Sequence, residues 1–323
     1  MLFSYSAYGL IIQADQQLPG LRNTPQTHGT ADFFIYFQPV PDDRALDWRP
    51  HHRFVSRHPA DQGEHPALKI LESTDGRYTR LIYSEGLAFT LNQTADSVWV
   101  TYAASIPFEY VTLYLLNAVI AMCLRMRETV CLHASAVAVA DRALVIVGSS
   151  GAGKSTLASY FAQRQHPVFC DDVCVLREGE SNLYAQPGCP QLRLMPESTE
   201  ALFGHADALT LIAEGWSKQV LHLDEQGYRF ADKALPIGAV YILMPRAAME
   251  SIQPLNPTRA LLMLMNNTYL DYLLDQKLRA VDMRVLARLV AHVPVRLVTP
   301  QDDIERLPDL YDHLLQDFHA VHP

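Results

Sequence analysis

This chain of 323 residues has few of the features that mark disulfide-rich, nucleic-acid-binding or membrane-spanning proteins. Its five cysteines are an odd number without C-x-x-C spacing, which favours reduced thiols in a cytoplasmic protein. Basic residues are also few: 26 Lys and Arg stand against 35 Asp and Glu, for a formal net charge of −9. So acidic a chain is a poor general binder of nucleic acid or of anionic membranes, because phosphate contacts need a basic surface.

Long apolar runs are missing too. The start, MLFSYSAYGLIIQADQQ, lacks a basic leader followed by an apolar core, so we expect no signal peptide. The most apolar segment, VTLYLLNAVIAMCL at 111–124, is shorter than the roughly 20 residues that span a bilayer, and Arg125 and Arg127 follow it. We therefore expect a buried helix there, a cytoplasmic location and no membrane partner.

The pattern of the chain changes near Pro107. Before it, short apolar runs predict strands, with hairpins that turn at Asp75-Gly76 and between Asn92 and Asp96, and a polar loop at 49–66. After it, residues 108–127 have helical spacing, and strands then alternate with helices. We expect an α/β fold, with a smaller β-rich N-terminal domain at 1–107 and a catalytic domain at 108–323.

Within the second part, the elements can be placed more closely. The sequence predicts two strands within 130–148 that turn at Asp141-Arg142, a helix at 154–164 and a strand at 167–176. A further strand is expected at 234–245, helical structure across 258–292, and a last helix near 309–318.

The strongest motif is GSSGAGKST, which follows the apolar run ALVIV and leads into a predicted helix. It fits G-x-x-x-x-G-K-[ST], the phosphate-binding loop, in the strand–loop–helix context that this loop requires. Its backbone N–H groups and the helix start can hold phosphates, Lys154 can reach the β- and γ-phosphates, and Ser155 can bind Mg²⁺. The nucleotide-binding residues expected are Gly148, Ser149, Ser150, Gly151, Ala152, Gly153, Lys154, Ser155 and Thr156.

Two adjacent acids interrupt the apolar segment HPVFCDDVCVL at 166–176. Burying unpaired carboxylates is costly, so Asp171 and Asp172 need compensating partners. The strand immediately after the P-loop helix can bring them to Mg²⁺ and to an acceptor hydroxyl, which suits a kinase. We take them as candidates for the metal ligand and the general base. Neither an LSGGQ-like nor an NKxD-like motif is present.

Other polar residues are weaker candidates. Arg193 and Lys218 could be further cations that contact the transferring phosphate. His51, His52, His58 and His65 lie in a polar loop, and their spacing fits no rigid metal site. Cys170 and Cys174, beside the acids, are best interpreted as small buried hydrophobic residues.

Residues 132–176, LHASAVAVADRALVIVGSSGAGKSTLASYFAQRQHPVFCDDVCVL, resemble the catalytic core of HPr kinase/phosphorylase and its relatives. That family has a histidine at a strand start, a P-loop soon after it, and an Asp-Asp pair after the P-loop helix. The resemblance implies a P-loop kinase core that uses ATP and Mg²⁺. It assigns Asp171 as the general base on a serine hydroxyl, places Asp172 and Ser155 near Mg²⁺, and places His133 beside the γ-phosphate.

Outside this stretch the chain departs from the family. The family's downstream signature, of the type Glu-Ile/Val-Arg-Gly-Leu-Gly, is replaced by QPGCPQLRLMPES, so we do not expect the reverse, phosphorolytic reaction. The N-terminal YSAYGLIIQADQQLPGL is similar to HPr-kinase-like proteins found with ribosomally made peptides, some of which phosphorylate a serine of a lasso-peptide precursor. The resemblance implies a peptide or small protein with a serine as the acceptor, and it permits a homo-oligomer.

Three alternatives remain open. The acceptor could be a small molecule, or the chain could be a nucleotide-gated binding module with slow ATP hydrolysis. A degenerate, non-catalytic homologue is a third, although intact Lys154, Ser155 and both acids argue against it. The sequence does not decide between ATP, GTP and pyrophosphate as the donor, or which of Asp171 and Asp172 is the base.

Overall fold

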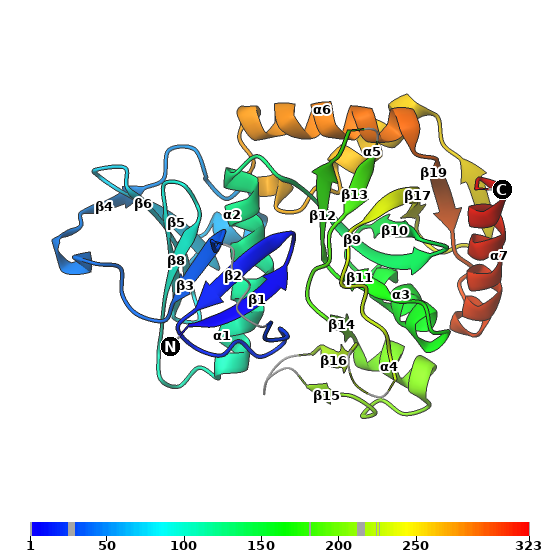
Figure 1. Cartoon of the computed structure of the whole chain (residues 1–323), viewed down its shortest axis with the longest axis horizontal. Helices are drawn as coiled ribbons and strands as arrows, with labels where there is room; N and C mark the ends of the chain where they lie inside the picture. The colour runs from blue at the N-terminus through cyan, green and yellow to red at the C-terminus, as the bar shows by residue number, and fades with distance from the viewer. Residues whose placement is uncertain are drawn as a thin grey trace. The chain divides into compact units, whose positions relative to one another are not determined.

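The computed structural model describes residues 2–24, 30–180, 182–211, 217–223, 225 and 227–322, and it has a mixed α/β architecture (Figure 1). Its contacts separate two compact units. The first comprises Met1–Thr129 and Leu270–Val281, and the second comprises Val130–Tyr269 and Asp282–Pro323. The sequence pattern placed a boundary near residue 107, before the apolar helix. By its contacts, that helix belongs to the first unit, so the observed division lies after the helix, at Thr129.

The first unit contains an eight-stranded sheet in the order β1-β2-β3-β8-β7-β6-β5-β4. Both expected hairpins are confirmed, since β5 pairs with β6 and β7 with β8, all antiparallel. Inward-facing side chains such as Leu87, Phe89 and Leu91 on β7 are fully buried. The strands are β1 (Phe3–Ala7), β2 (Leu10–Ala14), β3 (Phe33–Tyr36), β4 (Trp48–Pro50), β5 (Leu68–Ser73), β6 (Tyr78–Tyr83), β7 (Leu87–Asn92) and β8 (Ser97–Tyr102).

A helix follows the sheet of the first unit, as expected. It comprises α1 (Phe108–Tyr114), a π-helical turn η3 (Leu115–Val119) and α2 (Ile120–Met126). The Tyr8 hydroxyl donates to the Leu116 carbonyl in the π-helical turn, at 2.5 Å. Among the described residues, Phe108–Met126 is the one helix long and apolar enough to cross a membrane, yet 67% of its apolar window is buried, as in core helices that pass the same test.

In the second unit, five strands pair with one another in a closed ring. Strand β10 pairs with both β9 and β17, so the pairings β10-β9-β12-β13-β17 return to β10. Strands β19 and β18 extend the sheet beyond β17, and β11 also pairs with β9. The strands are β9 (Val130–Val139), β10 (Arg142–Gly148), β11 (Val168–Cys170), β12 (Val173–Glu178), β13 (Leu183–Ala185), β17 (Leu235–Leu243), β18 (Ser251–Pro254) and β19 (Val295–Thr299).

The prediction of one continuous strand over 167–176 was wrong. The chain forms β11 and β12, which are separated by Asp171 and Asp172. Asp172 has φ 64°, in the left-handed region that a strand does not use. The break turns the two carboxylates toward different surroundings, as described below.

The helices of the second unit are α3 (Lys154–Gln163), α4 (Pro196–Phe203), α5 (Pro257–Met265) and α7 (Leu307–Ala320), and α6 (Gln276–His292) joins the unit at Asp282. The expected helical structure over 258–292 is therefore two helices, separated by the short 3₁₀ helix η4 (Asp271–Leu273). A small sheet in the order β14-β16-β15 completes the unit, from β14 (Gln191–Leu194), β15 (Thr210–Leu211) and β16 (Gln219–His222).

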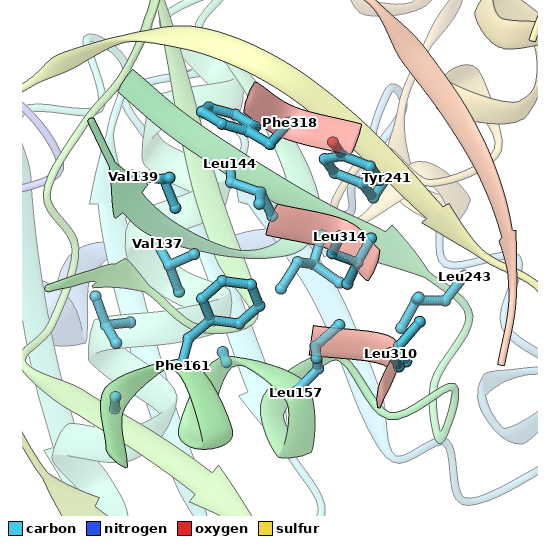
Figure 2. Packing of buried hydrophobic residues seen from close by; sticks show 14 of the residues in the cluster. Val137, Val139, Leu144, Leu157, Phe161, Tyr241, Leu243, Leu310, Leu314 and Phe318 are labelled. Carbon is cyan, nitrogen blue, oxygen red and sulfur yellow. The ribbon is translucent and has the colours of Figure 1, made fainter. Parts of the chain in front are cut away.

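One hydrophobic core of the second unit joins side chains of β9, β10 and β17 to those of the helices α3 and α7. Figure 2 shows Leu157 and Phe161 of α3, Leu314 and Phe318 of α7, and Leu144 of β10 in one cluster of buried side chains. These side chains are at most 1% exposed. This packing fixes the start of α3 beneath the end of β10, and so it fixes the P-loop between them.

Three parallel strands end at one edge of this sheet. Strand β17 is parallel to both β10 and β19, so the residues after Gly148, Leu243 and Thr299 gather there. The loop after β19 is tied to the loop after β17, because Ala247 N–H donates to the Pro300 carbonyl and Asp302 N–H donates to the Ala247 carbonyl, at 3.0 and 2.9 Å. The carboxyl edge of parallel strands is where open α/β sheets bind ligands.

Candidate active site

The P-loop residues Gly148–Thr156 connect β10 to α3 in a tight curl. Gly151 and Gly153 have φ 80° and 97°, conformations that favour glycine. At Gly148 the approach is close: a Cβ there would lie 3.1 Å from the Ala152 Cβ and 3.2 Å from the Leu243 carbonyl oxygen. At Gly151 a Cβ would meet nothing within 4 Å, so the loop is open on that side.

The Lys154 ammonium lies folded against this loop. It donates to the carbonyls of Gly148 and Ser149 at 2.8 and 2.9 Å, and the residue is only 5% exposed. Burial lowers the pKa of Lys154, and the carboxylates of Asp172 and Asp171 oppose that shift. An open loop with a buried cation at its base fits the polyphosphate of a nucleotide.

Strand register explains why the two acids lie beside the P-loop. On β9, Ala134 is opposite Val147 of β10, which is the residue before the P-loop. The same strand pairs Ala136 with Cys170 and His133 with Val173, the two residues that flank the acids. The break between β11 and β12 is therefore held directly beside the start of the loop.

Asp171 is buried and accepts three hydrogen bonds. The hydroxyls of Ser135 and Ser155 donate to its Oδ1 at 2.6 and 2.8 Å, and the backbone N–H of Arg193 donates to its Oδ2 at 3.0 Å. These hydrogen bonds offset the free-energy cost of burying the Asp171 carboxylate. Burial and the neighbouring Asp172 charge nevertheless raise the pKa of Asp171, against the lowering effect of Arg193.

Asp172 faces a different environment, because its left-handed backbone turns it away from Asp171. Its Oδ2 lies 2.9 Å from the Arg193 guanidinium, and its Oδ1 lies 3.7 Å from His133 Nε2. Burial alone would raise the pKa of Asp172, but the positive charges of Arg193 and Lys218 and the contributions of His133 and Lys154 hold it below its usual value. Asp172 is thus ionised at neutral pH.

A cavity of about 310 Å³ opens over the P-loop. Among the described residues, four basic side chains line it, from Lys154, Arg193, Lys218 and Arg246, and Asp172 is the one carboxylate. Such a surplus of positive charge in a concave site attracts a polyanion. The remaining lining residues are His133, Ser150, Gly151, Gly153, Ser155, Thr156, Leu194, Met195 and Ser198, and Asp171 is not among them.

His133 lies at the side of this cavity with its backbone N–H held by the Asn267 carbonyl, at 2.8 Å. Its ring makes an edge contact with Tyr269 at 5.9 Å between centroids. Burial, followed by the charge of Lys154, lowers the pKa of His133 to about 4. At neutral pH the imidazole is uncharged, so it can donate or accept a hydrogen bond beside Asp172 without adding a positive charge.

The structure brings the sequence-predicted residues together and adds two that sequence reasoning missed. His133, Lys154, Ser155, Asp172, Arg193 and Lys218 all line the cavity. Ser135 was missed; its only signal was a hydroxyl inside an apolar strand, two residues after His133. Arg246 was also missed, although its place just after β17, at the carboxyl edge of the sheet, pointed to a ligand.

The polar loop of the first unit brings His51, His52 and Glu72 together, while His58 and His65 are not part of this cluster. The geometry opposes metal binding through His51. Its Nδ1 accepts the backbone N–H groups of Arg53 and Phe54, both at 3.0 Å, so the proton of the neutral ring is on Nε2 and faces Glu72. Glu72 is also paired with Arg49 at 2.9 Å. The cluster is therefore a hydrogen-bonded ion-pair network.

The two cysteines beside the acids are buried free thiols. Cys170 lies at the end of β11 and Cys174 lies on β12. A hydrogen bond with Cys174 and burial raise the pKa of Cys170 well above its usual value. A thiol that resists ionisation is a poor nucleophile, which agrees with a packing role.

Comparisons with known proteins add little to this geometry. No protein-family model matches the chain, and no curated protein matches it. Among solved structures, it is similar to the Hpr(Ser) kinase/phosphatase from Coxiella burnetii, with 16% identity over 59% of this chain and 96% of that chain, and a TM-score of 0.34. Because this TM-score is low, the similarity does not establish a shared fold.

Proposed function

We propose that this chain is an ATP- and Mg²⁺-dependent kinase that transfers the γ-phosphoryl group to a hydroxyl. One observation carries the proposal: the P-loop serine, Ser155, donates to a buried acid, while a second acid, Asp172, stands in the cationic cavity above the same loop. A P-loop with an acid beside its serine is the arrangement that holds Mg²⁺ on a nucleotide.

Each basic residue has a role in this proposal. The loop N–H groups and Lys154 bind the β- and γ-phosphates, and Arg193, Lys218 and Arg246 offset the negative charge that spreads over the transferring group. Mg²⁺ would be held by Ser155 with an acid of the pair, and it would neutralise phosphate charge. The uncharged His133 would orient Asp172 or the γ-phosphate through a hydrogen bond.

The geometry favours an exchange of the roles that the family resemblance assigned to the two acids. Asp171 is bound to Ser155 and does not line the cavity, which suits the carboxylate that supports the metal. Asp172 lines the cavity, so its carboxylate is the one of the pair that an acceptor hydroxyl in the cavity can reach, and it can accept the hydroxyl proton. We therefore propose Asp172 as the general base and Asp171, with Ser155, at the Mg²⁺ site.

The acceptor we propose is a serine of a peptide or small protein, and a ribosomally made, lasso-type precursor is the specific case. The proposal includes a cytoplasmic location, no nucleic-acid or membrane partner, and a chain that is able to form a homo-oligomer. It also takes the β-rich N-terminal part as a domain separate from the P-loop domain. A small-molecule kinase and a nucleotide-gated binding module remain the alternatives.

Mass spectrometry tests the acceptor. The purified protein is incubated with ATP, Mg²⁺ and candidate acceptors, above all any small peptide encoded beside its gene. The proposal expects one added phosphate on a serine, and no such product with the Lys154→Ala variant. Phosphate on a metabolite alone would replace the peptide acceptor with a small molecule. ATP consumption with no phosphorylated product would favour the binding module.

A further inference from the structure

A second cavity lies in the second unit, at the end of β10 that is remote from the P-loop. It has a volume of about 330 Å³, within the size range of small-molecule sites. Because Arg142 begins β10 and Gly148 ends it, about 20 Å of extended strand separates this cavity from the phosphate-binding loop. The lining residues, none of which the proposed kinase chemistry uses, are Ala140, Arg142, Phe318, His319, Val321 and His322.

The polar side chains of this cavity are all basic. They are Arg142, His319 and His322, and no carboxylate lines the cavity in the part of the chain that the structure describes. The nearby acid of α7, Asp317, is already paired with Arg296 at 3.0 Å. In a chain with a net charge of −9, a hollow lined by basic groups alone favours an anion.

Arg142 is the side chain that most needs a ligand. It is half-buried, yet its guanidinium makes no hydrogen bond or ion pair with any residue that the structure describes. Asp141, beside it in the turn, is exposed and does not line the cavity. A guanidinium has five N–H donors in a planar fork, and donors shielded from water without an acceptor are costly. The fork matches two oxygens of a carboxylate or a phosphate group.

The two histidines add donors from another element. His322 Nε2 donates to the Gly238 carbonyl at 3.0 Å, which leaves Nδ1 as the ring nitrogen for a ligand. A histidine in the last turn of a helix, such as His319, is also favoured by the helix dipole. The dipole does not explain Arg142, which begins β10 and is not part of α7.

A glycine allows the walls of the cavity to meet. Phe318 is 1% exposed, and a Cβ at Gly238 would lie 2.6 Å from its ring and 3.0 Å from the Cβ of Arg142. The start of β10 and the end of α7 are therefore packed against the same residue of β17. This packing holds Arg142 and the histidines in place before a ligand binds, which lowers the entropic cost of binding.

We infer that this cavity is a binding site for a small oxyanion, which the guanidinium fork of Arg142 and ring N–H groups of His319 and His322 hold together. The ligand class is a small molecule with a carboxylate or phosphate group, since the volume leaves room for an organic body beside the anionic group. The site is separate from the cavity over the P-loop, because the two share no lining residue. The inference does not depend on the proposed function.

Nuclear magnetic resonance of the histidine rings tests the site. The full chain, labelled with ¹³C-histidine, is titrated with inorganic phosphate in one arm and with acetate in the other, at constant pH and ionic strength. The ring signals of His319 and His322, assigned with His319→Gln and His322→Gln, should shift and saturate with at least one anion. The anion that saturates at the lower concentration shows which oxyanion the site prefers. His133 reports separately on phosphate that binds over the P-loop.

A variant pair locates the effect. Arg142→Gln removes the fork and should raise the dissociation constant about tenfold or more. Arg259→Gln removes the same charge from an exposed position on α5 that lines neither cavity, and it should leave binding unchanged. The inference is overturned if neither anion shifts the two rings of the wild type to saturation, or if Arg142→Gln binds as tightly as the wild type. Either result leaves the kinase proposal standing.

Discussion

Replacement of Asp172 by asparagine should slow the turnover of ATP by about 10²–10⁴-fold, the usual contribution of a general base. This corresponds to about 3–5 kcal/mol of activation free energy. Asparagine keeps the shape and an oxygen that can accept from Arg193, which lies 2.9 Å from the carboxylate, so the fold and ATP binding should survive. What is lost is the negative charge in the cavity that takes the proton.

Asp171→Asn is the matched control, because Asp171 is the adjacent acid but does not line the cavity. It removes the charge that Ser155 and Ser135 face. It should therefore raise the Mg²⁺ concentration needed for half-maximal turnover, with much of the rate restored at high Mg²⁺. A coupled assay of ADP release over a range of Mg²⁺ concentrations measures both variants. The assignment is refuted if Asp172→Asn keeps the wild-type rate within tenfold while Asp171→Asn is inactive at every Mg²⁺ concentration.

Three further predictions concern stability. Gly238→Ala should lower the free energy of unfolding by about 1–3 kcal/mol, because its Cβ would lie 2.6 Å from the Phe318 ring. In urea titrations, Phe318→Leu should lower the free energy of unfolding less in the Gly238→Ala variant than in the wild type. Purely additive effects of the two changes would contradict the clash. Ser135→Ala should cost about 1 kcal/mol by removing a buried donor to Asp171, and an unchanged urea midpoint would count against that bond. Burial lowers the pKa of His51 to about 4 from 6.5, so the unfolded chain binds more protons between these pH values, and stability should fall by up to about 3 kcal/mol as the pH decreases through this window. In His51→Gln, urea unfolding at pH 7 and pH 5 should show a smaller difference, and an identical pH slope would exclude His51 as the cause.

Much of the site could be predicted from sequence because its signals are local. The P-loop is a contiguous motif whose glycines and lysine have fixed spacing, and the hairpin at Asp75-Gly76 is specified by its two turn residues. The two acids stood out because unpaired carboxylates are rare in apolar runs. For the P-loop, the hairpin and the pair of acids, the residue types within a short stretch were enough to predict what the structure shows.

The remainder depends on contacts between distant residues. Strand register, which no short pattern specifies, places Ser135 opposite Ile146 and brings its hydroxyl to Asp171. The conformation of Asp172 breaks the expected strand, because the acids are satisfied by different partners on either side of the break. Leu270–Val281 belongs to the first unit although it follows the P-loop by more than a hundred residues. Hydrophobic periodicity reports local structure, so it cannot reveal that a late segment makes its contacts with an early part of the chain.

The fate of the γ-phosphoryl group tests the central claim most directly. Phosphorus NMR of the protein with Mg²⁺, ATP and candidate serine-containing peptides distinguishes a phosphate monoester from inorganic phosphate. The kinase account predicts a monoester signal that grows as ATP is consumed, and that is absent with Asp172→Asn. Inorganic phosphate as the sole product, across all peptides and small-molecule hydroxyls tried, would contradict it and would leave a nucleotide-hydrolysing switch in its place.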